Sequence, residues 1–229
     1  MKVIEIQNLR KVYDEKTFPV HALNGVDLTF EEGEFAVVVG PSGSGKTTLL
    51  NILGGLDKAT EGKVFVEGKD METLSSRKMI DFRLRNIGFV FQAYNLIPVL
   101  TAKENVEFIM HLQKTPKKKR NERTKELLEA VGLGDKLNVR PNKLSGGQQQ
   151  RVAVARALAS KPKFILADEP TANLDSKSAE VLLDIMEKLN KEENITFVFS
   201  THDIRVVRKA RRVITLEDGK IVSDEQQNN

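Results

Sequence analysis

The segment from Gly40 to Thr47 most constrains what this chain can fold into, because it reads Gly-Pro-Ser-Gly-Ser-Gly-Lys-Thr. This order fits G-x-x-x-x-G-K-[ST], the phosphate-binding P-loop. Its glycines let the backbone turn successive N–H groups inward around an anion. Lys46 supplies a charge for the outer phosphates of a nucleotide, and the Thr47 hydroxyl is the expected Mg²⁺ ligand. The candidate nucleotide contacts here are Gly40, Pro41, Ser42, Gly43, Ser44, Gly45, Lys46, Thr47 and Thr48.

The residues that flank this segment agree with the motif. Residues 35–39 form an apolar run suited to a buried parallel strand, and residues 47–56 have helical spacing. The phosphate is therefore expected at a helix N-terminus, where the helix dipole favours an anion. A flexible glycine turn that happens to contain a lysine is the alternative, but such a turn need not lie between a strand and a helix.

Composition narrows the class of protein without deciding its function. The 229 residues are 40% hydrophobic and 30% charged, which is ordinary for a globular protein, and no apolar run approaches the length that spans a bilayer. The start of the chain does not have the shape of a signal peptide. With no cysteine, disulfides and thiolate metal sites are excluded, which fits a reducing cytosol. The net charge of +4 is compatible with nucleic acid or an anionic membrane face and decides neither.

Strand and helix patterns alternate along most of the chain, which predicts an α/β fold with a mostly parallel sheet. Strands are expected at residues 3–12, 20–30, 64–66, 87–91, 164–167, 195–199 and 213–216, and helices at 75–85 and 178–189. From about residue 93 to residue 161 the pattern is helical, with a capping-box spacing at Thr101 and Glu104. We therefore expect one domain, in which residues 1–92 and 162–224 form the nucleotide-binding core and residues 93–161 a helical insertion. Residues 225–229 are polar and are expected to be a disordered tail.

Two acidic residues, Asp168 and Glu169, directly follow an apolar run. Ligands in open α/β sheets lie at the carboxyl ends of strands, so both acids are expected to face the same crevice as the P-loop. Neighbouring residues on a strand point to opposite faces, so the two acids should have different roles. Asp168 suits support of the Mg²⁺ held by Thr47, and Glu169 suits orienting and deprotonating the attacking water. The alternative is a solvated acidic turn.

A second glycine-rich segment, Leu144-Ser-Gly-Gly-Gln148, also opens a helical pattern. Ser145, the N–H groups around Gly146 and Gly147, and the helix dipole could bind an anion. An ordinary loop before a helix is the alternative. The chain thus has two candidate phosphate-binding loops but only one Asp-Glu pair that directly follows an apolar run. A dimer would explain this difference, because loops from two chains could share one site.

These segments together make the chain similar to the ATP-binding-cassette (ABC) ATPases over nearly its whole length. The matching segments occur in that family's order: Gly40–Thr47 (Walker A), Gln92 (Q-loop), Leu144–Gln148 (signature), Phe164–Asp168 with Glu169 (Walker B), Asn173–Asp175 (D-loop) and His202 (H-loop). The resemblance implies a P-loop NTPase core, an N-terminal antiparallel β subdomain and an inserted α-helical subdomain. It also implies ATP and Mg²⁺ as ligands.

The same resemblance implies a homodimer in which each ATP lies between one chain's P-loop and the other chain's signature. Tyr13 would stack on adenine, Gln92 would touch the metal and the water, and His202 would reach the γ-phosphate. A surface tyrosine and a polar cap are the alternatives for Tyr13 and His202. The implied contacts across the dimer are Ser145, Gly146, Gly147, Gln148 and Asp175; the implied catalytic residues are Glu169, His202, Lys46 and Gln92; the implied metal ligands are Thr47, Gln92 and Asp168.

A narrower resemblance, to cassettes of the lipoprotein-release and macrolide-export type, rests on Asn51–Asp57 followed by Thr60-Glu61-Gly62, and on Ile87–Leu100. It implies a separate transmembrane permease, an ATPase on the inner face of the cell membrane, and no nucleic-acid partner. The surface formed by Tyr94, Leu96, Ile97, Val99 and Leu100 would receive the permease, unless these residues belong to the core of the helical block. The basic run of residues 117–120 is expected on a solvated helix face, with an anionic membrane surface as the alternative.

Two alternative classes of protein remain for a chain of this kind. A soluble cassette ATPase of DNA repair or translation would show an ATPase rate that depends on nucleic acid. A small-molecule P-loop kinase would transfer phosphate to an acceptor, but it leaves the signature and His202 unexplained.

Overall fold

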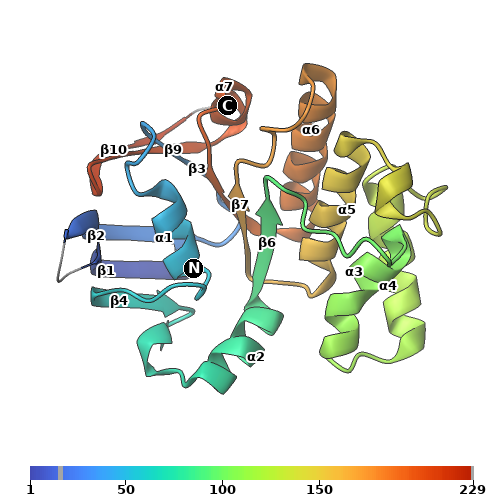
Figure 1. Ribbon diagram of the computed structural model, residues 1–229, viewed down its shortest axis with the longest axis horizontal. Helices are drawn as coiled ribbons and strands as arrows, with labels where there is room; N and C mark the ends of the chain where they lie inside the picture. Colours follow the sequence, from blue (N-terminus) through green and yellow to red (C-terminus); the bar gives the residue numbers. More distant parts are fainter. Residues whose placement is uncertain (15–17, 228–229) are drawn as a thin grey trace.

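The computed structural model describes residues 1–14 and 18–227, and within these residues the strands form two sheets (Figure 1). The first sheet is antiparallel, in the order β2-β1-β4-β5: β1 (Lys2–Tyr13), β2 (Val20–Glu31), β4 (Glu61–Val66) and β5 (Lys69–Asp70). The second has the order β10-β9-β3-β8-β7-β6: β3 (Phe35–Val39), β6 (Ile87–Phe91), β7 (Phe164–Asp168), β8 (Thr196–Ser200), β9 (Arg212–Glu217) and β10 (Lys220–Gln226). All its neighbours are parallel except β9 and β10, which form an antiparallel hairpin. The predicted mostly parallel sheet and N-terminal antiparallel sheet are confirmed.

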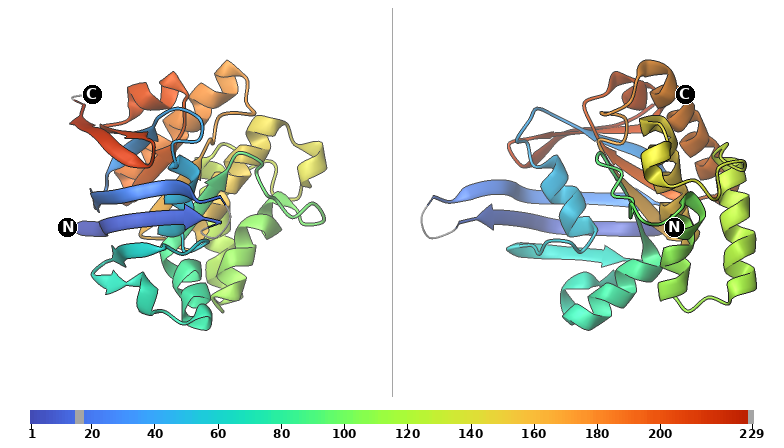
Figure 2. Two further views of the ribbon diagram at one scale, coloured as in Figure 1. Left: turned by 60° about the vertical axis from the view of Figure 1, so that its left-hand side comes forward. Right: turned by 45° about the vertical axis from the view of Figure 1, so that its right-hand side comes forward.

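The helices lie on both sides of the second sheet, and α1 lies between the two sheets (Figures 1 and 2). Their bounds are α1 (Lys46–Leu53), α2 (Ser76–Asn86), α3 (Ala102–Leu112), α4 (Lys117–Ala130), α5 (Gly146–Ala159), α6 (Ser176–Glu193) and α7 (Ile204–Lys209), with 3₁₀ turns η1 (Met71–Thr73) and η2 (Pro141–Lys143). One apolar core packs α1 against both sheets, and a second packs α3 to α6 against the opposite face of the six strands. Across residues 1–14 and 18–227, no helix is both long and apolar enough to cross a membrane.

The sequence patterns place most elements to within a few residues. Helix α1 ends at Leu53 and not at residue 56, because Gly54 and Gly55 follow and glycine weakens a helix interior. The predicted capping box of α3 is present: Thr101 Oγ1 accepts from the Glu104 N–H at 3.2 Å, and Glu104 Oε2 accepts from the Thr101 N–H at 2.8 Å.

The end of the chain differs from its expected disorder. Glu225 and Gln226 belong to β10 and pair with Val213 and Arg212 on β9. The N–H of Gln227 also donates to the Arg211 carbonyl at 2.8 Å. The backbone ladder satisfies these residues whatever their side chains, so polar composition misled the prediction. Residues 228–229 lie outside the described residues.

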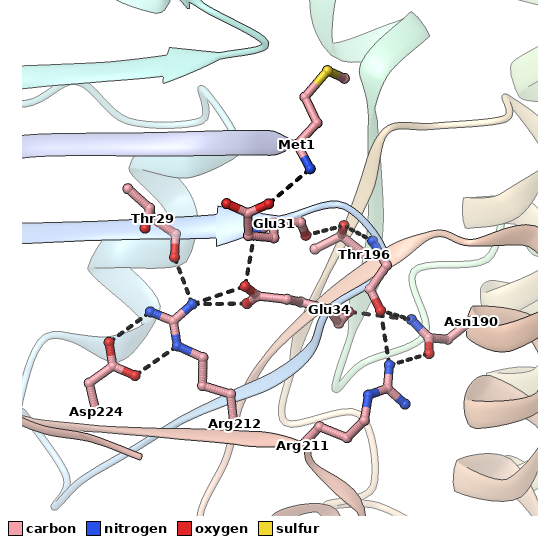
Figure 3. A network of polar contacts seen from close by, with 10 residues as sticks. Met1, Thr29, Glu31, Glu34, Asn190, Thr196, Arg211, Arg212 and Asp224 are labelled. Atoms are coloured by element: carbon pink, nitrogen blue, oxygen red, sulfur yellow. Dashed lines mark hydrogen bonds and ion pairs between the residues drawn. The ribbon is translucent and has the colours of Figure 1, made fainter. Parts of the chain in front are cut away.

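A polar network ties the β9–β10 hairpin to the start of β3 (Figure 3). Arg212 is only 8% exposed and binds the Asp224 carboxylate through Nε and Nη2, each at 2.7 Å. Its Nη1 donates to the Thr29 carbonyl at 2.7 Å and to Glu34 Oε2 at 2.9 Å. The hydrogen bond to Asp224, with Glu34 nearby, raises the pKa of Arg212. Because Glu34 directly precedes β3, this network fixes the base of the strand that leads into the P-loop.

Candidate active site

A cavity of about 750 Å³ opens at the carboxyl ends of the parallel strands, the position at which open α/β sheets bind ligands. The P-loop follows β3, Gln92 follows β6, Glu169 follows β7, and His202 follows β8. The hairpin of β1 and β2 closes one side of the cavity. The lining residues are Tyr13, Val20, His21, Ala22, Gly40, Pro41, Ser42, Gly43, Ser44, Gly45, Lys46, Thr47, Thr48, Gln92, Glu169, Ala172, Ser200 and His202.

The P-loop has a backbone conformation that side chains would block. Gly40 and Gly45 have φ of 149° and 104°, and an added Cβ would lie 2.0 Å and 2.3 Å from the carbonyl oxygens of Leu216 and Ala22. Only glycine fits these two positions. The Lys46 ammonium folds back over the loop and donates to the Gly40 and Pro41 carbonyls at 2.8 Å and 2.9 Å. A positive charge therefore lies within the loop that opens α1.

Thr47 lines the cavity and its Oγ1 donates to Asp168 Oδ1 at 3.3 Å, whereas Asp168 is not among the described lining residues. Burial raises the pKa of Asp168, although hydrogen bonds from Ser200 and Thr47 oppose this effect. A buried carboxylate without a full counter-charge suits a cation, and a hydroxyl with a carboxylate is an oxygen donor set of the kind Mg²⁺ takes. In the described part of the chain no cluster of three or more His, Cys, Asp or Glu could hold a metal, so phosphate oxygens would have to complete such a site.

Glu169 turns away from Asp168 and contacts the strand beside it. Its φ is 46°, in the left-handed region, and its N–H donates to the Ser200 carbonyl at 2.8 Å. Oε2 accepts from Thr201 Oγ1 at 2.7 Å, and Oε1 lies 2.7 Å from His202 Nδ1. An ionised carboxylate only accepts, so Nδ1 is the donor in this contact. The two neighbouring acids thus have different partners: the P-loop threonine for one, the residues after β8 for the other.

Gln92 and Tyr13 line the cavity from two other directions. Gln92 shares a reciprocal contact with Asn173, in which Asn173 Nδ2 donates to the Gln92 carbonyl at 3.0 Å and Gln92 Nε2 lies 3.5 Å from Asn173 Oδ1. The Tyr13 hydroxyl donates to Asp57 Oδ2 at 2.7 Å. Burial and then this hydrogen bond raise the pKa of Tyr13.

The signature segment lies outside this cavity. Residues 145–148 are not among the described residues that line it. Ser145 caps α5, with Oγ accepting from the Gln148 N–H at 3.2 Å and Gln148 Oε1 accepting from the Ser145 N–H at 2.9 Å. Asp175 caps α6 in the same way, accepting from the N–H and the hydroxyl of Ser178 at 2.9 Å and 2.6 Å. The structure therefore brings together the residues predicted after β3, β6, β7 and β8, but not those of the signature.

Comparison with known proteins decides the family, since residues 23–172 match the family model for the ABC transporters. The chain belongs to the ABC transporter family. This cassette is 52% identical to an ABC transporter ATP-binding protein of Thermotoga maritima over 220 residues, which cover 96% of this chain and 94% of that protein. It is also 46% identical over 226 residues to the macrolide export ATP-binding/permease protein MacB of Aggregatibacter actinomycetemcomitans, covering 99% of this chain but 35% of MacB.

The cassette is also similar to solved structures. It superposes with a TM-score of 0.89 and 44% identity, over 99% of both chains, on a dimeric post-hydrolysis state of the cassette MJ0796 of Methanocaldococcus jannaschii bound to ADP and Pi. These relatives confirm the predicted ABC family and the similarity to macrolide-export cassettes. They give no support to a repair or translation ATPase or to a small-molecule kinase.

Sequence reasoning missed several residues around the site of this cassette. Thr201, which binds Glu169, adjoins a candidate residue but has no motif of its own. His21 and Ser200 line the cavity, and Asp57 holds the Tyr13 hydroxyl from 44 positions along the chain. Only the three-dimensional fold reveals such contacts.

Proposed function

We propose that this cassette binds and hydrolyses ATP at the cavity behind its P-loop, as one half of a homodimer that drives a separate membrane permease. The observation that carries the proposal is the pairing at the carboxyl ends of adjacent strands. Thr47 binds Asp168, and Glu169 binds His202. Thr47, Glu169 and His202 line the cavity, so a triphosphate held in the P-loop would lie close to both pairs.

In this proposal the P-loop residues grip and orient the substrate. The uncapped first turn of α1 and the Lys46 ammonium attract the phosphates, and Tyr13 at the cavity mouth stacks on the base. Thr47, Asp168 and the Gln92 side chain would hold Mg²⁺. When bound, this ion neutralises charge on the phosphate oxygens.

Glu169 is the proposed general base. Its two carboxylate oxygens each have more than one lone pair, so they can accept a water hydrogen while still bound to Thr201 and His202. These two contacts fix the orientation of the carboxylate that would accept the proton of the attacking water. Electrostatic positioning of this kind carries most of the catalysis in phosphoryl transfer.

The second copy of the chain supplies the signature. Ser145 Oγ accepts from the Gln148 N–H, so its own O–H remains free to donate to a phosphate of the partner's nucleotide. Because this segment does not reach the cavity of its own chain, a composite site requires two chains. The resemblance to the dimeric MJ0796 structure supports this arrangement.

The permease would dock in an apolar groove of about 370 Å³ near the Q-loop. Its apolar lining residues are Leu84, Ile87, Phe89, Phe91, Ile97, Phe108, Ile109 and Ala157. Of the surface expected from the sequence, Ile97 lines this groove, whereas Leu96 packs against the core of the helical block. We propose that residues 93–161 form a helical subdomain beside the core of residues 1–92 and 162–224. The groove has lining residues from both parts. Similarity to MacB supports a permease of the export type, which would place the cassette at the inner face of the cell membrane.

The Glu169→Gln variant tests the proposed chemistry. It should bind ATP as the parent does, because the P-loop is untouched, but its release of inorganic phosphate should fall by about a hundredfold or more. When ATP is added, a stable dimer of this variant should therefore accumulate, and light scattering would detect it. Glu192→Gln, an exposed change on α6, is the matched control and should behave as the parent. Phosphate release by Glu169→Gln at the parent rate would show that another group deprotonates the water.

A further inference from the structure

Tyr13 lies at the mouth of the cavity where β1 ends, and the residue is 40% exposed. Its hydroxyl donates to Oδ2 of Asp57 at 2.7 Å. The other oxygen of the same carboxylate accepts from Lys11 Nζ at 2.8 Å and from the Lys58 N–H at 2.7 Å. Burial opposes ionisation, but these hydrogen bonds outweigh it and lower the pKa of Asp57. The ionised carboxylate therefore fixes the end of the Tyr13 side chain.

Asp57 reaches Tyr13 from the far end of α1, the helix that begins at the P-loop. Beyond the helix, the N–H groups of Leu56 and Asp57 both donate to the Asn51 carbonyl, at 2.8 Å and 3.2 Å. This wrapped turn sets the position of the carboxylate relative to the helix. The phosphate loop therefore precedes α1, and the anchor of Tyr13 lies in the turn that follows it.

Lys11 covers one face of the Tyr13 ring. Its ammonium lies 4.6 Å from the ring centroid, its side chain is only 13% exposed, and it donates to the Lys58 carbonyl at 2.8 Å. Tyr13 lines the cavity, whereas Lys11 and Asp57 are not among the described residues that do. A cation held against one face leaves the other face for an aromatic ligand.

We propose that Asp57 is a positioning residue for the nucleotide base, which holds the Tyr13 ring so that its free face receives the base. The inference rests on the proposed nucleotide site. A charge-assisted hydrogen bond is stronger than a neutral one, so the ring is ordered before the ligand arrives. Binding then does not bear the entropic cost of immobilising it. Because the turn with Asp57 follows α1 and is hydrogen-bonded to Asn51 of that helix, α1 and this turn connect the phosphate loop to the base contact.

Tyrosine fluorescence can test this role, because the chain has two tyrosines and no tryptophan. In a Tyr94→Phe background, Tyr13 is the only tyrosine, and its emission should change with ATP but not with inorganic triphosphate. Asp57→Ala should weaken ATP binding about three- to tenfold, the cost of ordering one side chain. Its calorimetric affinity for triphosphate, which has no base, should stay the same. Asp57→Asn keeps an acceptor and should lose less, and the exposed change Asp81→Asn should lose nothing.

A double-mutant cycle separates positioning from general support of the fold. Tyr13→Phe has no hydroxyl, so adding Asp57→Ala to it should weaken ATP binding by less than about twofold. If Asp57→Ala weakens ATP and triphosphate binding equally, or leaves both unchanged, Asp57 does not position the base. If the parent protein binds neither ATP nor triphosphate, the proposed nucleotide site itself is wrong, and this inference is wrong with it.

Discussion

The P-loop and the signature segment (residues 144–148) both open a helix with glycines, but they differ in conformation. In the P-loop, Gly40, Gly43 and Gly45 have φ of 149°, 81° and 104°. The loop curls around its own cavity, and α1 begins with no side-chain cap on its first turn. Its first N–H groups are left for a ligand. In the proposed function, the P-loop would therefore form a phosphate site within one chain.

The signature segment has an ordinary helix start. Gly146 and Gly147 lie within α5, and Ser145 and Gln148 close a capping box over its first turn. Part of this helix end is already satisfied by the chain itself. This difference supports the proposed division of roles, in which the P-loop of one chain holds a nucleotide and the signature of the other chain adds to it.

Removing the P-loop charge should give the largest effect. Lys46→Ala should weaken ATP binding about a hundredfold, or near 3 kcal/mol, because a charged hydrogen-bonding group is lost from the phosphate pocket. Equilibrium binding by calorimetry measures this directly. The exposed change Lys78→Ala on α2 is the control and should bind like the parent. ATP affinity that survives in Lys46→Ala would mean that the P-loop does not grip a nucleotide.

A change in the signature should separate turnover from binding. Ser145→Ala removes a donor to the partner's phosphate, so turnover should fall about ten- to a hundredfold. Binding of ATP by the isolated chain should stay the same, because Ser145 is not among the described lining residues of the cavity. Phosphate release and calorimetry on the same sample check the two halves of the prediction.

The capping box of α3 offers a matched control for Ser145→Ala. Thr101→Ala removes an equivalent cap, so each variant should lose about 1 kcal/mol of unfolding free energy. Only Ser145→Ala should lose turnover. If the two variants have equal turnover, Ser145 acts only as a helix cap. The signature would then have no role in catalysis that distinguishes it from the cap of α3.

The sequence predicts the fold and most of the site because its signals are local. Glycine spacing identifies the P-loop, and apolar runs identify β3, β6, β7 and β8, whose carboxyl ends then bring the candidate residues together. Contacts between distant residues leave no such signal. The pairing of Glu169 with His202 and of Tyr13 with Asp57 depends on how strands and turns pack. The ordering of Glu225 in β10 likewise depends on its partner strand β9, not on its own composition.

Acid should weaken the contact between the loops that follow β7 and β8, through Asp203. Burial would raise its pKa, but hydrogen bonds from Arg205 and Thr171 lower it to about 2, below its usual value of 3.8. Thr171 Oγ1 donates to Asp203 Oδ2 at 2.6 Å, so Asp203 joins the loop after β7 to the loop that carries His202. The capping box of α5 has no carboxylate. Acid should therefore weaken the contact between the loops after β7 and β8 while this cap stays intact.

The stability that Asp203 contributes is fully present above pH 3.8 and is lost as pH falls toward 2. At neutral pH, Asp203→Asn should therefore unfold with about 1–2 kcal/mol less free energy than the parent, and this difference should shrink steadily in acid. Denaturant unfolding of both proteins across this range measures the difference, in which the titration of all other carboxylates cancels. Asp81→Asn, in an exposed ion pair on α2, should show almost no difference at any pH. A gap between Asp203→Asn and the parent that does not change with pH would mean that Asp203 acts by its shape and not by its charge. The contact between the loops after β7 and β8 would then depend on an ionised carboxylate no more than the cap of α5 does.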